Sequence, residues 1–215
     1  PEWVYADLAA LSCTAVSVPV YHTEGIDTLK HIVNDSGSRI LFLASQLMAK
    51  DVAEQWDEMK NLETVVLLDG RLDHPDILSL DEFTEKGASV PVGEVKQRLE
   101  AGTGDDLATL VYTSGTTGVP KGAMLTHANL LATHHHTMAF WPVVEEGKEV
   151  IIAFLPFYHI YGQIVAMING LFLGGTLVLF TTVDLDDIID AVDLHQATML
   201  FGVPTFYEYL KEHPR

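Results

Sequence analysis

One short segment of the chain combines hydroxyl-bearing residues, glycines and a lysine. It covers residues 113–122 and lies between two predicted strands, 107–112 and 123–126. Hydroxyls and the backbone N–H groups that glycines leave accessible suit phosphate oxygens, and Lys121 adds a positive charge. The segment is not a Walker A loop, because Pro120 precedes the lysine and a glycine follows it. We interpret it as a polyphosphate-binding loop, with a flexible linker as the alternative.

A histidine in an apolar segment is the second candidate for chemistry. His159 follows a predicted strand over 150–155 and is flanked by Tyr158 and Tyr161. A histidine in such surroundings is more often a satisfied core residue than a catalytic group. The residues alone therefore leave both interpretations open.

Predicted helices and strands alternate along almost the whole chain, which is how the candidate residues would be positioned. Repeated β-α units with continuous apolar strands predict an α/β fold of mostly parallel sheets flanked by helices. We expect helices over 2–14, 26–35, 48–59, 127–140, 160–173, 185–195 and 204–213, and strands over 16–20, 40–44, 64–68, 107–112, 123–126, 150–155, 176–180 and 198–201. Residues 69–106 give only short helical hints, around 80–86 and 94–101.

A polar segment over residues 100–106 is the best linker candidate in the chain. We therefore expect two packed subdomains, residues 1–101 and residues 102–215, with the phosphate-binding loop 113–122 in the second. The chain begins without a methionine and stops just after a helical pattern, so we expect an internal piece of a longer protein.

Composition and charge exclude several function classes. The 215 residues include 30 acidic and 12 basic side chains, a net charge of −18 that argues against nucleic acid as a partner. Residues 150–183 contain no charged side chain, but Pro156 and several glycines interrupt them, which favours a buried sheet over a transmembrane segment. The single Cys13 cannot form an internal disulfide, and we expect a cytoplasmic protein.

Other conspicuous residues have simpler explanations than a site. Consecutive helical positions point about 100° apart, so the histidines at 134–136 cannot share one zinc face. The aspartates over 184–190 are typical of the first turns and solvated face of a helix. Cys13, in an apolar helix, is typical of a small core residue.

Four segments together resemble the adenylate-forming superfamily, which includes acyl-CoA synthetases, luciferases and peptide-synthetase adenylation domains. Residues 112–122 are similar to its phosphate loop, and residues 124–130 to the continuation of that loop. Residues 154–162 are similar to its second motif, and residues 202–205 to a later strand end. The opening, residues 1–21, resembles the fatty acyl-CoA synthetase (long-chain fatty acid–CoA ligase) branch, and we identify the chain as a fragment of the N-terminal domain.

The resemblance implies a two-step ligase. A fatty-acid carboxylate reacts with MgATP to give an acyl-adenylate and pyrophosphate, and coenzyme A then displaces AMP to give a thioester. The implied partners are thus a fatty acid or other small carboxylic acid, ATP and coenzyme A, with Mg²⁺ as cofactor and a homodimer as one option for assembly. An enzyme that activates an aryl or amino acid and a non-catalytic nucleotide-binding module remain alternatives.

The resemblance also assigns roles to individual residues. Lys121 and His159 are the expected catalytic residues, and Thr113 is the expected magnesium ligand, with a glutamate partner outside this chain. The expected contacts to the ATP phosphates are Thr113, Ser114, Gly115, Thr116, Thr117, Gly118 and Lys121. The expected contacts to the carboxylate substrate are His159, Tyr161, Gly162 and Gln163.

The family's later motifs do not occur in this sequence. It contains neither a Tyr-Gly-x-Thr-Glu segment, whose glutamate completes the magnesium site, nor the C-terminal domain with its adenylation lysine. We therefore expect the isolated chain to be inactive.

Overall fold

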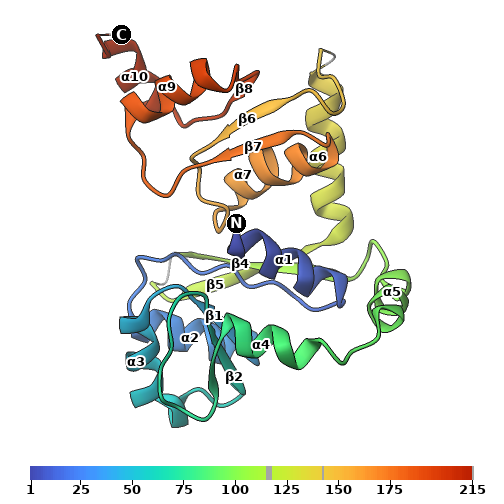
Figure 1. The fold of residues 1–215 in the computed structure, drawn as a ribbon, viewed down its shortest axis with the longest axis vertical. Coiled ribbons are helices and arrows are strands. Elements are labelled where there is room, and N and C mark those ends of the chain that lie inside the picture. The colour runs from blue at the N-terminus through green and yellow to red at the C-terminus, as the bar shows by residue number, and fades with distance from the viewer. Residues whose placement is uncertain (115–117, 142, 215) are drawn as a thin grey trace. The chain divides into compact units, whose positions relative to one another are not determined.

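A computed structural model describes residues 1–114, 118–141 and 143–214 and divides into two units. Residues 2–127 form the first unit, coloured blue to green in Figure 1, and residues 128–215 with Pro1 form the second. Each unit is built from helices packed on strands. The subdomain boundary predicted at residues 101–102 stays a prediction.

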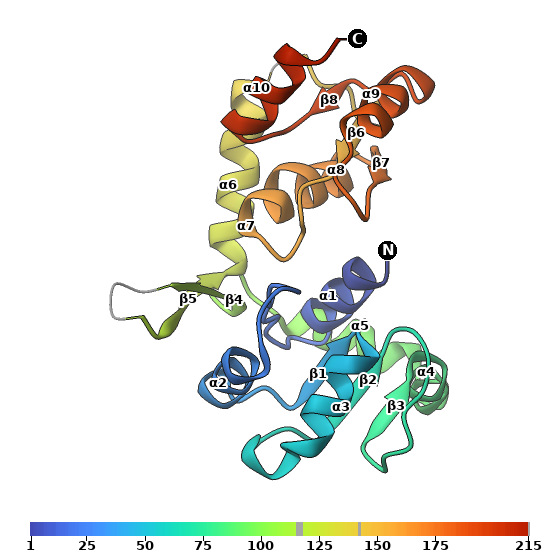
Figure 2. The same cartoon turned by 90° about the vertical axis from the view of Figure 1, so that its left-hand side faces the viewer.

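A parallel three-stranded sheet organises the first unit. Strands β1, β2 and β3 are paired in that order and lie side by side in Figure 2. Helix α3 packs on β1 and β2, and α2 packs on α3. The helices and strands are α1 (Glu2–Ser12), α2 (Ile26–Ser36), β1 (Ile40–Leu43), α3 (Gln46–Glu54), a 3₁₀ turn (Trp56–Glu58), β2 (Thr64–Leu67), β3 (Ile77–Ser79), α4 (Leu80–Gly87), α5 (Val92–Ala101), β4 (Leu107–Ser114) and β5 (Pro120–Thr126).

The core of this unit follows from the sequence pattern. Leu29 and Val33 lie one turn apart on one face of α2, and both are buried. They pack with Val52 of α3 and with Val65 and Leu67 of β2. Burial of such side chains contributes about 1.5–3 kcal/mol each. This packing fixes helix α2 to the sheet.

A second parallel sheet, of order β7-β6-β8, organises the other unit. The side chains of its central strand point alternately into two hydrophobic cores, because successive side chains of a strand point to opposite faces of the sheet. Ile152 packs with Ile188 of α9, whereas Ile151 and Ala153 pack with Ala166 on the other face. The elements are α6 (His127–Phe140), β6 (Val150–Ala153), α7 (Ile160–Gly162), a π-helix (Gln163–Ile168), α8 (Asn169–Phe172), β7 (Thr176–Leu179), α9 (Leu185–Leu194), β8 (Met199–Leu200) and α10 (Pro204–Glu212).

The predicted α/β fold with mostly parallel sheets is confirmed, since β4 and β5 form the one antiparallel pair in the described residues. Two element predictions are wrong, and one strand was missed. The expected strand 16–20 is reduced to a single bridge between Ser17 and Thr109. The expected helix 48–59 ends at Glu54 and continues as a 3₁₀ turn, and the short strand β3 was not predicted.

The uncharged stretch over residues 150–183 is divided between β6, a helical segment and β7. In the part of the chain that the structure describes, no helix is both long and apolar enough to cross a membrane.

Candidate functional site

The predicted loop is largely a β-hairpin. Residues 113–114 extend β4, residues 120–122 begin β5, and Thr113 pairs directly with Lys121. Directly opposed residues of an antiparallel pair present their side chains on the same face, with Cβ atoms about 5 Å apart. The side chains of Thr113 and Lys121 therefore leave the hairpin on the same face. The predicted bounds of the loop, 113–122, are wrong at both ends, because residues 113–114 and 120–122 belong to paired strands.

The side chains of Thr113 and Lys121 are both exposed. None of the ion pairs among the described residues involves Lys121. A lysine with no internal carboxylate partner keeps its charge available to an anion. The chain has a net charge of −18, so the exposed Lys121 gives the hairpin a positive charge that is opposite in sign to the charge of the whole chain.

Tyr112 and helix α2 support the base of this hairpin. The Tyr112 hydroxyl donates a hydrogen bond to the Asp35 carboxylate at 2.6 Å. Burial, followed by this hydrogen bond and the neighbouring negative charge, raises the pKa of Tyr112 well above its ordinary value. The phenol therefore stays protonated and remains a donor. Sequence analysis did not identify this pair, because the two residues lie 77 positions apart.

His159 occupies the N-cap position of helix α7, directly after the turn that follows β6. The Tyr161 backbone N–H donates to Nδ1 of His159 at 3.1 Å. A ring nitrogen that accepts a hydrogen bond carries no proton, so the proton of the neutral ring is on Nε2. The side chain is exposed. The N–H group on Nε2 is a donor of the kind that a carboxylate or phosphate oxygen accepts.

The tight turn around His159 requires a glycine at position 162. A Cβ at this position would lie 2.4 Å from the carbonyl oxygen of Pro156, so a side chain would force the turn apart. The helix then continues as a π-helix whose first residue, Gln163, is buried. Such π-segments frequently occur at functional sites. The Tyr161 hydroxyl lies 3.5 Å from the carbonyl oxygen of Gly202, which brings two of the recognised segments together.

The structure therefore brings the predicted site residues together in two groups. Thr113 and Lys121 meet in the hairpin of the first unit, and Gly118 precedes β5 there. In the second unit the predicted substrate residues His159, Tyr161, Gly162 and Gln163 are contiguous. Gly115, Thr116, Thr117 and the side chain of Ser114 lie outside the described residues.

The three consecutive histidines are structural at least in part. His134 is buried, lies 2.8 Å (Nδ1 to Oδ1) from Asn169 and stacks on Phe172. Asp184 caps α9 by accepting the backbone N–H of Asp187 at 3.2 Å, as expected for an acidic first turn. Among the described residues no cluster of three or more histidine, cysteine or acidic side chains could hold a metal ion.

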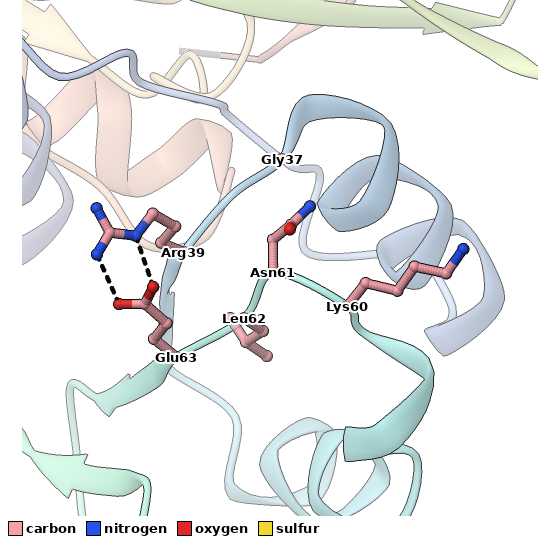
Figure 3. Close-up of a pocket in the computed structure, with 6 residues that line it drawn as sticks. All are labelled: Gly37, Arg39, Lys60, Asn61, Leu62 and Glu63. Atoms are coloured by element: carbon pink, nitrogen blue, oxygen red, sulfur yellow. Dashed lines mark hydrogen bonds and ion pairs between the residues drawn. The ribbon is translucent and has the colours of Figure 1, made fainter.

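Two surface hollows lie among the described residues. One of about 230 Å³ is lined by residues 37, 39 and 60–63, where Arg39 and Glu63 form a bidentate pair with both bonds at 2.8 Å (Figure 3). The other, of about 280 Å³, is lined by Trp141, residues 143–144 and residues 198–201. Neither is lined by a predicted site residue. The Arg39 guanidinium in the first hollow is paired with Glu63, and Lys60 lines the same hollow.

The whole chain, residues 1–215, matches the family model of the AMP-binding enzymes. The chain belongs to this family. It is 34% identical over 207 residues to the long-chain-fatty-acid–CoA ligase FadD15 of Mycobacterium tuberculosis, covering 96% of this chain and 33% of that protein. It is also 30% identical over 216 residues to a feruloyl-CoA synthase of Amycolatopsis sp, covering 100% of this chain and 39% of that protein.

Solved structures agree with this assignment. The ATP-bound MatB of Rhodopseudomonas palustris is 27% identical and superimposes with a TM-score of 0.71 over 99% of this chain and 39% of that one. The chain thus spans about a third of the length of the curated ligases that it matches. The resemblance to the adenylate-forming superfamily is confirmed.

Proposed function

We propose that this chain is the phosphate-binding and carboxylate-orienting part of an ATP-dependent acid–thiol ligase whose acid is a long-chain fatty acid. The observation that carries the proposal is the pairing of Thr113 with Lys121 across the hairpin, with both side chains exposed. The long-chain-fatty-acid–CoA ligases among its relatives support the choice of acid.

The first half-reaction joins two anions. A carboxylate oxygen attacks the α-phosphorus of ATP, and the bond from that phosphorus to the bridging oxygen breaks and releases pyrophosphate. Lys121 and the hydroxyls of the hairpin would bind the β- and γ-phosphates and stabilise the negative charge that develops on the leaving group. His159 would orient the attacking carboxylate by donating from Nε2, the nitrogen that its cap leaves protonated.

A divalent metal fits the hairpin only as a partly protein-bound ion. The Thr113 hydroxyl is an oxygen donor of the kind that Mg²⁺ accepts, while the described residues supply no carboxylate cluster. Mg²⁺, when bound, neutralises phosphate charge. Thr113 would then contribute one ligand beside phosphate oxygens and water.

The second half-reaction transfers the acyl group. The sulfur of coenzyme A attacks the acyl carbonyl carbon of the adenylate, and AMP leaves with the electron pair of the broken C–O bond. We assign no residue of this chain to coenzyme A.

The feruloyl-CoA synthase match favours one alternative substrate class, an aryl carboxylic acid. Exchange of labelled pyrophosphate into ATP by the full-length protein tests both the reaction and the substrate. We expect exchange that depends on a long-chain fatty acid. Exchange that depends on ferulate instead would assign the aryl alternative, and ATP binding with no exchange for any acid would indicate a non-catalytic nucleotide-binding module.

A further inference from the structure

Helix α2 touches both strands of the hairpin at residues that adjoin the proposed phosphate contacts. Asp35 accepts the hydrogen bond of Tyr112, which precedes Thr113 on β4. His31 lies with Nε2 at 3.0 Å from the carbonyl oxygen of Pro120, which precedes Lys121 on β5. A carbonyl oxygen only accepts, so His31 is the donor in this bond.

The two helix residues act from one face. Positions four apart in a helix are neighbours on its surface, so His31 and Asp35 point the same way. The rings of His31 and Tyr112 meet edge to face, with centroids 6.4 Å apart and planes at 89°. The Tyr112 ring also covers Gly122, where an added Cβ would lie 3.0 Å from the ring. The tyrosine is thus enclosed by the helix on one side and the opposite strand on the other.

Helix α2 is itself firmly held. Its buried side chains belong to the core of the first unit. A rigid element that contacts both strands beside Thr113 and Lys121 fixes where those two side chains point.

We propose that His31 and Asp35 are positioning residues, which hold the two strands of the hairpin so that Thr113 and Lys121 meet the ATP phosphates together. This inference rests on the proposed function of the hairpin. Both residues would act through Pro120 and Tyr112 of the hairpin. Their effect therefore concerns ATP and not the carboxylate substrate.

The test compares variants of the full-length protein by steady-state pyrophosphate exchange and by equilibrium dialysis of ATP with Mg²⁺. Tyr112→Phe keeps the ring and removes the hydroxyl, and Asp35→Ala removes its acceptor. We expect each to raise the KM and Kd for ATP by about 3- to 10-fold, the usual effect of one lost hydrogen bond. The KM for the acid should stay within about twofold, and the double variant should be no worse than the single ones.

Two further variants distinguish a positioning effect on ATP binding from a loss of overall stability and from an effect of the Asp35 charge. Asp35→Asn keeps a carbonyl acceptor without the charge and should restore ATP binding, because the hydrogen bond matters and not the charge. Asn34→Ala removes two hydrogen bonds from the same helix without touching the hairpin. It should lower the Tm and leave the KM for ATP unchanged.

Each outcome decides the inference. If Tyr112→Phe and Asp35→Ala lower only the Tm, as Asn34→Ala does, the helix is structural and the inference is overturned. If Lys121→Ala weakens ATP binding while those two variants do not, the proposed function stands and the positioning role falls. If the unaltered protein binds no ATP, the proposed function fails, and this inference fails with it.

Discussion

At the scale of single residues, the proposed role of His159 depends on which of its two ring nitrogens carries the proton. The backbone N–H of Tyr161 fixes the acceptor role of His159 Nδ1, so the opposite nitrogen is the donor. The same bond caps a helix, and a capping side chain contributes about 1 kcal/mol of stability. A change at His159 therefore mixes a structural and a chemical effect, which the choice of variant can separate.

We predict that His159→Asn and His159→Ala both slow exchange, by about 10- to 100-fold, because both lose the imidazole donor. Only the alanine variant should lose stability, since the asparagine oxygen can still accept the Tyr161 N–H. Exchange kinetics and chemical denaturation give the two readouts. His136→Ala, an exposed histidine on α6, is the control. An asparagine variant with unaltered exchange would remove His159 from the site.

At the scale of elements, a close backbone approach makes the turn before the π-helix dependent on a glycine. We predict that Gly162→Ala destabilises the protein by about 1–3 kcal/mol, because its Cβ would lie 2.4 Å from a carbonyl oxygen. Gly93→Ala, in α5 with nothing within 4 Å, should be neutral or stabilising by about 0.5–1 kcal/mol. Denaturant unfolding measures both. Equal effects of the two substitutions would show that the turn adapts without strain.

Most helices and strands could be predicted from the sequence, but two features could not. Apolar periodicity located most helices and strands, since α2 and α9 bury a single stripe and β6 is apolar on both faces. It missed β3, a strand of three residues, and placed the hairpin in a loop, because Thr113, Lys121 and Gly122 have the composition of a turn. The helix contacts of Tyr112 and Pro120 join segments 77 and 89 positions apart, which no local pattern reveals.

At the scale of the whole molecule, two units each have their own parallel sheet and core. The proposed phosphate contacts belong to one and the proposed carboxylate contact to the other. The chain covers about a third of its curated relatives, so activity is a property to be measured on the full-length protein. The separate proposal of a subdomain boundary near residue 101 rests on the polar segment 100–106.

We propose that the hairpin binds the phosphates of ATP through Lys121. The most direct test is the Kd for ATP with Mg²⁺ of Lys121→Ala, compared with Lys50→Ala, which removes an exposed lysine from α3 of the same unit. We predict that Lys121→Ala raises the Kd by about tenfold or more, as expected for a lost charge-assisted contact, and that Lys50→Ala leaves it unchanged. An equal Kd for the two variants would contradict the claim.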